Sequence, residues 1–436
     1  GSRQLKSQDH DVIVIGAGAA GLAAAAALSS AERSVLVLEA RDRIGGRIWT
    51  RGDLDTPLPV ELGAEFIHGQ SHVMFDVLRR TQTIAVDAPA VHWMQRGDRL
   101  QQDEGLFDQV RKLMEPANEL REDISIEAWL DRPETRSATS DARELVRLMV
   151  EGFDAADPAR ASTLAIAAEW AGGAASEGQF RPLGGYGRAL HALADSLDPG
   201  RTRLQLQCVV EQVHWKRGHV EVQARAREGP IRHTARCAVV TLPLGVLKHA
   251  GVVFGPALDT KRSALAALEP APVVKAVLHF ADPFWESRDD GRYRDASFFH
   301  APDQPFPTFW TTLPYRTGQL VAWAGGPKAE RLAGRSETAL TEAAIAGLAA
   351  MFGSGNEIRA ALRSLHVHDW QRDPYSRGAY SYVAVGGRGA RAQLAEPLQD
   401  TLFFAGEATD AGDDATTVAG ALASGERAAH ELLSCI

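Results

Sequence analysis

The feature that most constrains this chain is an apolar run followed at once by three spaced glycines. Residues 11–15 are almost entirely apolar and β-branched, which is typical of a strand buried on both faces of a parallel sheet. Gly16, Gly18 and Gly21 follow with the G-x-G-x-x-G spacing, which permits a tight turn, close approach to a pyrophosphate and close helix–strand packing. Residues 22–28 are alanine-rich, so a helix is expected to begin here, with its N-terminus able to hold phosphate charge.

A second strand and an acidic residue complete this pattern. Residues 35–38 form another apolar run, and Glu39 follows, eighteen residues beyond Gly21. A carboxylate at that position can accept hydrogen bonds from both ribose hydroxyls of a dinucleotide. The glycine pattern alone is weak evidence, but strand, glycines, helix, strand and acid in this order predict a Rossmann-type α/β unit.

Length and composition bound what surrounds this unit. At 436 residues, with 45% hydrophobic and 24% charged residues, the chain is expected to form two globular domains that share interleaved segments. A formal net charge of −9 argues against a nucleic-acid or anionic-membrane partner and would suit a cationic substrate. The three cysteines form no C-x-x-C pair, which favours a reducing compartment and predicts no metal site. No stretch is long enough to span a bilayer, so we expect a soluble, cytoplasmic protein.

The dinucleotide unit continues in a way that nicotinamide-binding units do not require. A second glycine pair, Gly45-Gly46, is followed by Arg47. This extension resembles the flavin-dependent amine oxidases, which include polyamine oxidases, monoamine oxidases and lysine-specific histone demethylases, and the chain looks like a soluble, bacterial-type member. The resemblance implies an α/β, Rossmann-type FAD-binding domain and an interleaved α+β substrate domain, in which helices flank a mixed sheet. Arg47 and nearby backbone amides would meet the FAD pyrophosphate.

Residues 60–69, VELGAEFIHG, resemble the ELGAxWIHG segment of spermine and acetylpolyamine oxidases. The resemblance places Gly63-Ala64 beside the isoalloxazine and His68 near the substrate channel. His68 could bind or orient an amine, since imidazole titrates near neutrality, or it could be a loop histidine bonded to backbone. Phe66 replaces the tryptophan of the family, so the local wall is expected to differ.

Lys275 lies inside the apolar, strand-like run of residues 272–280. Burying an ammonium group is costly, so this lysine needs a partner or a function. In the amine oxidases a lysine at this point contacts a water bound to flavin N5 and assists the reaction of reduced flavin with oxygen. The alternative is a lysine at a strand edge that reaches solvent.

Residues 370–382 closely resemble the W-x-x-D-P-Y-S-R-G-x-Y-S motif of the family. Trp370 would pack near the flavin, and Tyr380 would stand on its substrate face as one wall of an amine cage. The electron-rich face of an aromatic ring attracts positive charge as an amine approaches. Monoamine oxidases attach flavin through a cysteine just before this tyrosine, whereas this chain has Ala379, so the resemblance implies non-covalent FAD.

Residues 402–409 and 416–421 resemble the closing FAGE…TVxGA motif. Glu407 would meet the ribitol, and the helix-terminal amides at Thr417-Val418 would meet the flavin pyrimidine. Negative charge that builds there during reduction would be stabilised by the helix N-terminus. Thr417 stands where monoamine oxidases carry the second tyrosine of the cage, and the demethylases show a similar pairing of tyrosine with threonine.

The other segments are assigned by pattern. Residues 71–178 read as amphipathic helices of a substrate domain, and strand-like runs follow at 204–213, 219–226 and 237–242, with Val210 on a strand resembling the one that reads adenine. The predicted FAD-binding domain comprises residues 10–70, 179–248 and 396–436, and the substrate domain 71–178 and 249–395. One or two acidic residues of the helical segment are expected to contact substrate, among Glu115, Glu119, Glu122, Asp123, Asp154, Asp157, Glu169 and Glu177.

Together these features predict FAD-dependent oxidation of a polyamine or other primary or secondary alkyl amine to an imine and then an aldehyde, with O2 reduced to hydrogen peroxide by a monomer or homodimer. The alternatives are an L-amino-acid oxidase, in which Arg372 or Arg377 would bind the substrate carboxylate, and a flavin-binding protein without turnover. The candidate catalytic residues are Lys275, Tyr380, Thr417, His68 and Trp370. The candidate cofactor-binding residues are Gly16, Gly18, Ala19, Ala20, Gly21, Glu39, Ala40, Arg41, Gly46, Arg47, Gly63, Ala64, Glu65, Val210, Trp370, Tyr375, Gly406, Glu407, Thr417 and Val418.

Overall fold

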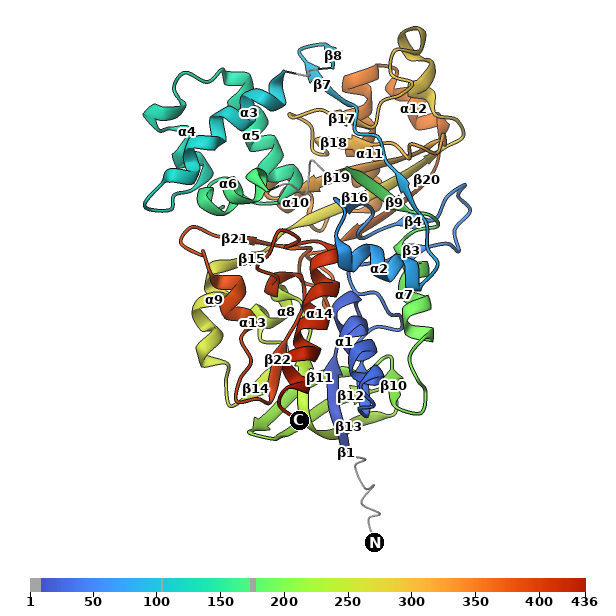
Figure 1. The fold of residues 1–436 in the computed structure, drawn as a ribbon. Helices are drawn as coiled ribbons and strands as arrows, with labels where there is room; N and C mark the ends of the chain where they lie inside the picture. The colour runs from blue at the N-terminus through green and yellow to red at the C-terminus, as the bar shows by residue number, and fades with distance from the viewer. Residues whose placement is uncertain (1–8, 103–104, 173–177) are drawn as a thin grey trace.

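Two large sheets, one in each half of the molecule, organise the fold (Figure 1). The computed structural model describes residues 9–102, 105–172 and 178–436. Within these residues the first sheet has eight strands in the order β10-β2-β1-β13-β12-β11-β14, with β22 beside β13. The second has seven strands in the order β20-β16-β19-β18-β17-β7-β8. This is the mixed α/β architecture that the sequence predicts.

The parallel part of the first sheet is built on the apolar runs of the glycine unit. β1 (Asp9–Ile15) pairs in parallel with β2 (Val35–Leu38) on one side and with β13 (Gly229–Val240) on the other. All four residues of β2 and residues 12–15 of β1 are at most 2% exposed, as expected for strands covered on both faces. β10 (Thr202–Gln205) and β22 (Leu402–Phe404) extend the parallel array.

The run at residues 204–213, predicted as one strand, is divided between two. Gln207 adopts a positive φ of 53°, which ends β10, and β11 (Val209–Lys216) begins after it. β11, β12 (His219–Ala226) and the first part of β13 form an antiparallel meander. A left-handed backbone conformation at a residue other than glycine leaves no signal in an apolar pattern.

Helices cover one face of the first sheet. The core on this face combines side chains of α1 (Ala19–Ser30), α2 (His72–Arg80), α7 (Tyr186–Asp195) and α14 (Val418–Leu433). α1 and α14 approach so closely that a Cβ atom on Gly425 would lie 2.2 Å from the carbonyl oxygen of Ala20. The first and last helices of the described chain therefore pack side by side, as Figure 1 shows.

The second sheet has a covered face and a face turned toward a cavity. Its strands are β16 (Val273–Phe280), β19 (Gln319–Gly325), β20 (Leu362–Asp369), β18 (Thr308–Trp310), β17 (Phe298–His300), β7 (His92–Arg96) and β8 (Arg99–Gln101). The core of the covered face includes side chains of α10 (Pro327–Leu332), α11 (Glu337–Phe352) and α12 (Gly355–Ala361). Across the cavity stand α3 (Leu106–Met114), η1 (Glu115–Glu119), α4 (Ile126–Leu130), α5 (Ser140–Phe153) and α6 (Thr163–Ala171).

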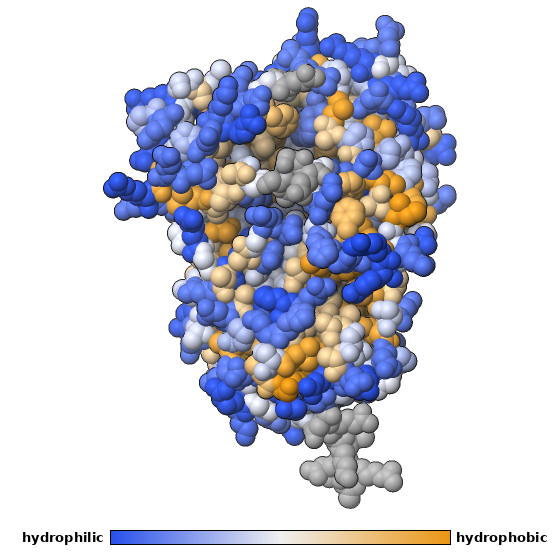
Figure 2. All heavy atoms as spheres, viewed as in Figure 1, coloured by the Kyte–Doolittle hydropathy of each residue, from blue (hydrophilic) through white to orange (hydrophobic). Residues whose placement is uncertain are grey.

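The remaining elements are short. They are β3 (Thr50–Arg51), β4 (Val60–Glu61), β5 (Ile67–His68), β6 (Ala85–Asp87), η2 (Pro133–Thr135), β9 (Gln179–Pro182), α8 (Leu244–His249), β14 (Val253–Gly255), η4 (Asp259–Lys261), α9 (Arg262–Ala267), β15 (Leu268–Pro270), η5 (Phe284–Gly291), β21 (Ser381–Val383), α13 (Ala390–Ala395) and η6 (Glu407–Thr409). In the described part of the chain no helix combines the length and apolarity needed to cross a membrane. Hydrophilic residues predominate on the face shown in Figure 2, where hydrophobic residues form scattered patches.

One more expectation needs correction. The purely helical reading of residues 71–178 is wrong for residues 85–101, which form β6, β7 and β8. β7 pairs with β17, so that His92 lies opposite Phe298, and such a distant partner is not visible in a local pattern. The domain boundaries stay a proposal, and we propose to move those at 248 and 70 outward, because β14 pairs with β11 of the first sheet and α2 packs in the core on that sheet. We keep the division into two domains as a proposal with these shifted boundaries.

Candidate functional site

A cavity of about 1100 Å³ lies between the two halves. It is lined by loops at the carboxyl ends of the parallel strands, by one face of the second sheet and by α3, α5 and α6. All of the candidate catalytic and cofactor-binding residues named from the sequence contribute to its walls. The structure thus brings residues from the first fifty positions and from the last forty to one place.

The glycine turn leaves the start of α1 open toward this cavity. Gly18 is the N-cap residue, no side chain caps the helix, and its first turn carries no acidic residue. The unpaired amides at a helix N-terminus attract an anion. Gly21 is required here, because a Cβ atom would lie 1.9 Å from the carbonyl oxygen of Gly16, which itself has a φ of 111°. These features fit the pyrophosphate of a dinucleotide.

Glu39 lies at the end of β2 and is 6% exposed. Its carboxylate accepts hydrogen bonds from the backbone N–H of Ala17 at 3.0 Å and of Arg41 at 2.8 Å. A carboxylate has about four acceptor positions, so about two are left for further donors at the cavity wall. This arrangement fits a ribose with two adjacent hydroxyls.

Arg41 connects the glycine unit to the C-terminal motif. Its guanidinium donates to Asp373 at 2.7 Å and to the hydroxyl of Ser376 at 2.7 Å. Burial opposes ionisation of Asp373, but hydrogen bonds from His368 and Arg41 outweigh it and hold the pKa of that carboxyl well below its usual range. The contact fixes residues 373–376 against the first βαβ unit.

Arg43 fastens the second glycine pair. It donates to the carbonyl oxygens of Gly46 and Ile48, each at 3.0 Å, and lies over the ring of Trp49 at 4.6 Å. Burial and the neighbouring Arg41 lower the pKa of Arg43 to about 10. The backbone that follows Glu39 is therefore held by arginine side chains on both sides of Asp42.

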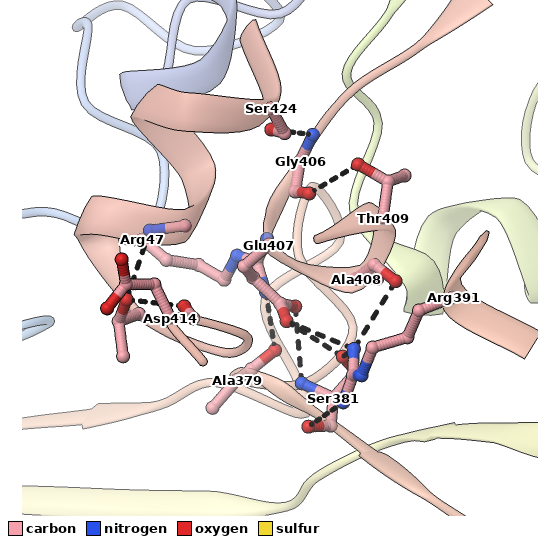
Figure 3. Close-up of polar contacts among 12 residues, drawn as sticks. Arg47, Ala379, Ser381, Arg391, Gly406, Glu407, Ala408, Thr409, Asp414 and Ser424 are labelled. Atoms are coloured by element: carbon pink, nitrogen blue, oxygen red, sulfur yellow. Dashed lines mark hydrogen bonds and ion pairs between the residues drawn. The ribbon is translucent and has the colours of Figure 1, made fainter. Parts of the chain in front are cut away.

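Arg47 and Glu407, predicted separately as cofactor contacts, form an ion pair (Figure 3). Arg47 Nη1 donates to Glu407 Oε1 and to the carbonyl oxygen of Ala379, each at 2.8 Å. Glu407 also accepts from the backbone N–H and hydroxyl of Ser381, and Arg391 lies 3.9 Å away. Burial raises the pKa of Glu407, but Arg47 and Arg391 outweigh this effect and lower it. Sequence reasoning missed Ser381 and Arg391 as partners, although Ser381 lies within the quoted C-terminal motif.

Lys275 lies inside the protein, with 3% of its side chain exposed, and lines the cavity. It is therefore not a strand-edge lysine in bulk water. Its Nζ donates to the carbonyl oxygen of Gly63 at 3.0 Å and to Glu65 Oε1 at 2.8 Å, and lies 5.5 Å from the centre of the Trp310 ring. The lysine has the partner that its burial requires.

Glu65 is shared between two cations. Besides Lys275, Arg181 Nη1 donates to its other oxygen at 2.6 Å, and Trp310 Nε1 donates to the same oxygen at 2.8 Å. Burial alone would raise the pKa of Glu65, but Lys275 and Arg181 outweigh it and lower the pKa to about 2. Arg181 also donates to the carbonyl oxygens of Thr311 and Leu313 and lies 4.5 Å over the Phe66 ring. Sequence analysis did not identify Arg181 as a partner of Glu65, because Arg181 lies on the separate strand β9.

Tyr380 and Trp370 supply aromatic walls of the cavity. The Tyr380 hydroxyl donates to the carbonyl oxygen of Phe153 at 2.6 Å, which fixes the ring. Burial, and then the neighbouring Asp154, raises the pKa of Tyr380 well above its usual value, so the phenol stays protonated. Trp370 is 3% exposed and donates from its indole N–H to the carbonyl oxygen of Leu62 at 2.9 Å.

Thr417 marks the start of the last helix, as the sequence predicts. Its hydroxyl donates to the carbonyl oxygen of Asp414 at 2.6 Å and accepts from the N–H of Gly420 at 3.0 Å. α14 then begins at Val418. The hydroxyl is thus an N-cap whose hydrogen bonds are made within its own loop and helix.

An acidic pair lies beside Tyr380. Glu169 lines the cavity, and Asp154, 5% exposed, has an Oδ2 atom with no hydrogen-bond partner in the described chain. Burial, and then the Glu169 carboxylate, raises the pKa of Asp154 well above its usual value. Asp154 therefore keeps its proton to a higher pH than an ordinary aspartate. Among the other acidic candidates Glu115 lines the cavity, Glu119, Glu122, Asp123 and Asp157 are outside its described lining, and Glu177 is outside the described residues.

His68 faces the cavity, and its ring has no hydrogen-bond partner among the described residues. Although this cavity-facing side chain has accessible surface, it lies deep within the protein, and burial lowers its pKa. Of the two arginines considered for a substrate carboxylate, Arg377 lines the cavity. Arg372 lines a neighbouring groove of about 890 Å³.

Comparison with known proteins agrees with this architecture. The family model described as "Flavin containing amine oxidoreductase" matches residues 19–433. Rice polyamine oxidase 3 is 29% identical, with 98% of this chain and 90% of the relative covered. Human lysine-specific histone demethylase 2 is 27% identical over 97% of this chain and 53% of its own length. The chain thus spans about half the length of that demethylase. Lysine-specific histone demethylase 1 homolog 2 from Arabidopsis thaliana is 31% identical, and the match covers 98% of this chain and 58% of that relative.

Solved structures share the fold. A structure of wild-type putrescine oxidase bound to putrescine superposes with a TM-score of 0.81 at 22% identity, with 98% of this chain and 99% of that chain covered. Cyclohexylamine oxidase from Brevibacterium oxydans IH-35A gives a TM-score of 0.79 at 22% identity with the same coverage.

Proposed function

This chain belongs to the flavin-containing amine oxidoreductase family, and from that membership we propose that it binds FAD non-covalently and oxidises a polyamine or another primary or secondary alkyl amine. The observation that carries the proposal is the shared cavity, in which Lys275 and Tyr380 lie with the residues suited to hold a dinucleotide. Polyamine, putrescine and cyclohexylamine oxidases among its relatives point to the same class of substrate.

The chain would hold FAD through groups at both of its ends. The open N-terminus of α1 suits the pyrophosphate, Glu39 suits the ribose, and the N-terminus of α14 suits the electron-rich pyrimidine edge. Ala379 precedes Tyr380 and offers no thiol for a covalent bond, which supports non-covalent attachment. Bound FAD would supply the two-electron oxidant, while the protein supplies binding, orientation and electrostatics.

The substrate amine would meet one aromatic face and one acidic pair. The ring of Tyr380, held by its hydrogen bond to residue 153, attracts a cation and aligns the carbon to be oxidised. Glu169, with Asp154 as its buried neighbour, would draw the ammonium group into the cavity. The amine must lose its proton before its C–H bond is oxidised, so activity is expected to rise toward alkaline pH.

The reaction is balanced without another co-substrate. The amine loses two electrons and two protons and becomes an imine, which water hydrolyses to an aldehyde and a smaller amine or ammonia. O2 accepts the two electrons and two protons and leaves as hydrogen peroxide. The Lys275 ammonium would hold a positive charge and a proton where O2 is reduced, and Glu65 and Gly63 fix its position.

Anaerobic flavin spectroscopy tests the proposal. Purified holoenzyme is mixed with spermine, N-acetylspermine, putrescine, simple monoamines and L-amino acids, and the flavin absorbance is followed. Bleaching by one or more amines, with hydrogen peroxide released on adding O2, is expected. Protein that stays colourless and cannot be reconstituted with FAD would refute the proposal. Bleaching by L-amino acids alone would favour the amino-acid oxidase alternative, with Arg377 as the carboxylate partner because it lines the cavity.

A further inference from the structure

A pair of histidines stands in the cavity wall, several strands along the second sheet from Lys275. β7 and β17 pair in parallel and bring His92 beside His300, whose Nε2 lies 2.9 Å from His92 Nδ1. The two ring planes differ by 7°, which suits an in-plane N–H···N hydrogen bond. The ring of Phe298 stacks on His92 at 4.6 Å with the same 7° tilt, and all three side chains line the cavity.

Both imidazoles are neutral at physiological pH. Burial lowers the pKa of His92 to about 4, and burial together with His92 lowers that of His300 to about 3. A neutral imidazole carries one proton, so the pair holds two, and one of them lies in the hydrogen bond between the rings. The second proton must sit either on His300 Nδ1 or on His92 Nε2.

The surroundings decide between these two positions. His300 Nδ1 is buried and has no hydrogen-bond partner, so a proton there would be an orphaned donor, which proteins avoid more strictly than an orphaned acceptor. Within the described chain, His92 Nε2 is not one of the buried atoms that lack a hydrogen-bond partner, and the His92 ring faces the cavity. His300 therefore donates from Nε2 to His92 Nδ1, and His92 keeps its proton on Nε2, directed to accessible space.

We propose that His92 Nε2–H, held in this tautomer by His300, is a binding subsite for a hydrogen-bond-accepting oxygen on the substrate, remote from the nitrogen that is oxidised. The inference rests on the proposed amine oxidation. It assigns His92 to substrate specificity and His300 to positioning. The acceptor is an uncharged amide, hydroxyl or ether oxygen.

A second ammonium group does not suit this subsite. An ammonium has only donors, and it would meet another N–H donor and a neutral ring rather than a carboxylate. Phe298 and Phe107, whose ring lies 5.3 Å from that of His92, offer apolar contact to a carbon chain. The charged groups of α3 and η1 that also line the cavity, Arg111 and Glu115, carry opposite signs.

The place of His92 also sets the shape of the substrate. β16, which carries Lys275, and β7 stand four strand positions apart in the second sheet, each step being about 4.8 Å. Between them an aromatic path leads from Lys275 over Trp310, at 5.5 Å, to Phe298, at 6.0 Å, and on to His92. A substrate that places its amine at Tyr380 and its oxygen at His92 is therefore elongated.

Binding to the reduced holoenzyme tests the proposal, because reduced enzyme cannot oxidise the ligand. Anaerobic calorimetry compares alkylamines, their ω-acetamido derivatives and the α,ω-diamines over a series of chain lengths. The acetamido compounds of matching length should bind about five- to tenfold more tightly than the alkylamines. His92→Phe, which keeps an aromatic ring, should abolish this preference. His300→Phe should weaken it, and His300→Gln, whose amide N–H can replace Nε2–H, should restore it.

Nitrogen NMR of histidine-labelled protein reads the tautomer directly. His92 should be protonated at Nε2 and bare at Nδ1, and an acetamido ligand should shift the Nε2 signal. His219→Phe, on the exposed part of β12, is the matched control and should change neither readout. A proton on His92 Nδ1, or a preference that survives His92→Phe, would overturn the proposal. If no amine bleaches the flavin, the proposed oxidation fails, while the tautomer and the binding preference still decide this inference.

Discussion

Two buried carboxyl groups beside the same cavity meet the cost of burial in opposite ways. Glu65 is ionised and held by Lys275, Arg181 and Trp310, each within hydrogen-bonding distance. At Asp154, burial and the neighbouring Glu169 instead raise the pKa and favour the neutral carboxyl, and one of its oxygens has no hydrogen-bond partner in the described chain. A buried charge is tolerated only when it is paired, and otherwise the group becomes neutral. The two sides of the cavity thus differ in charge although both are acidic in sequence.

The largest effect is expected from breaking the paired side. Arg181→Met should destabilise the protein by about 3–5 kcal/mol, because it leaves the buried Glu65 with one cation. Chemical denaturation at pH 7 measures the change. Arg262→Met, which removes an exposed ion pair with Asp259, is the control and should stay within about 0.5 kcal/mol. Equal effects of the two substitutions would show that the buried ion pair of Arg181 with Glu65 contributes no more to stability than an exposed ion pair.

The same pairing should appear in the acid range. The pKa of Glu65 is lowered in the folded state to about 2, below its ordinary value. Its stabilisation is therefore fully present above about pH 4.5 and is lost as the pH falls toward 2. Glu65→Gln should flatten this part of the stability profile, measured by denaturation at a series of pH values. A profile unchanged by Glu65→Gln would contradict the assignment of the shift to this residue.

Lys275→Met tests whether the cation on the paired side also acts on oxygen. Reoxidation of reduced flavin should slow by about a hundredfold or more, the scale of losing a positioned proton donor or charge. Stopped-flow mixing of reduced enzyme with O2 gives this rate, while the rate of anaerobic reduction by amine separates it from substrate oxidation. Unaltered reoxidation would remove the role proposed for Lys275.

On the side of the cavity where Asp154 lies, removing the carboxyl should raise the stability of the protein rather than lower it. Asp154→Asn removes a buried carboxyl whose ionisation the fold opposes, so the variant should be more stable than the parent at pH 7. The folded-state pKa of Asp154 is raised, so parental stability declines as the pH rises above about 4 toward that pKa, and the difference should grow with pH over this interval. Thermal denaturation from pH 4 to 8 measures it. A destabilised variant with a parallel profile would place an ionised Asp154 in the fold.

The smallest effect is expected at Thr417, where the loss of stability measures what one N-cap hydrogen bond contributes. Thr417→Ala should cost about 1 kcal/mol through loss of the N-cap, and Thr417→Ser should retain most of it. Steady-state kinetics of the same pair then separate capping from catalysis. If Thr417→Ser has parental stability but strongly altered kcat, the threonine methyl group has a role at the substrate.

The local motifs were predictable because each is complete within a few residues. The strand–glycine–helix unit, the buried lysine strand and the start of the last helix at Val418 all follow from short-range patterning and caps. β7 was missed because its pairing partner lies some two hundred residues away. Arg181 was missed for a similar reason, since only the folded chain brings β9 to Glu65. The raised pKa of Asp154 depends on burial and on the neighbouring Glu169, and no spacing of residues in the sequence reveals either of them.

Separation along the sequence also explains why Arg47 and Glu407 were predicted as two separate cofactor contacts. Each was identified, but as an independent contact, because nothing in a sequence shows that a side chain near the start and one near the end will share a hydrogen bond. Sequence patterning therefore predicted which residues line the cavity better than it predicted their hydrogen-bond partners.

The packing of α14 on α1 also bears on how the protein is made. One wall of the proposed dinucleotide site, Glu407 and the start of α14, is synthesised long after the glycine turn at residues 16–21. A nascent chain that already displays the glycine turn still lacks that wall. Cofactor loading therefore requires that the chain has been made through α14, and chains cut short before residue 407 should accumulate as empty, protease-sensitive species.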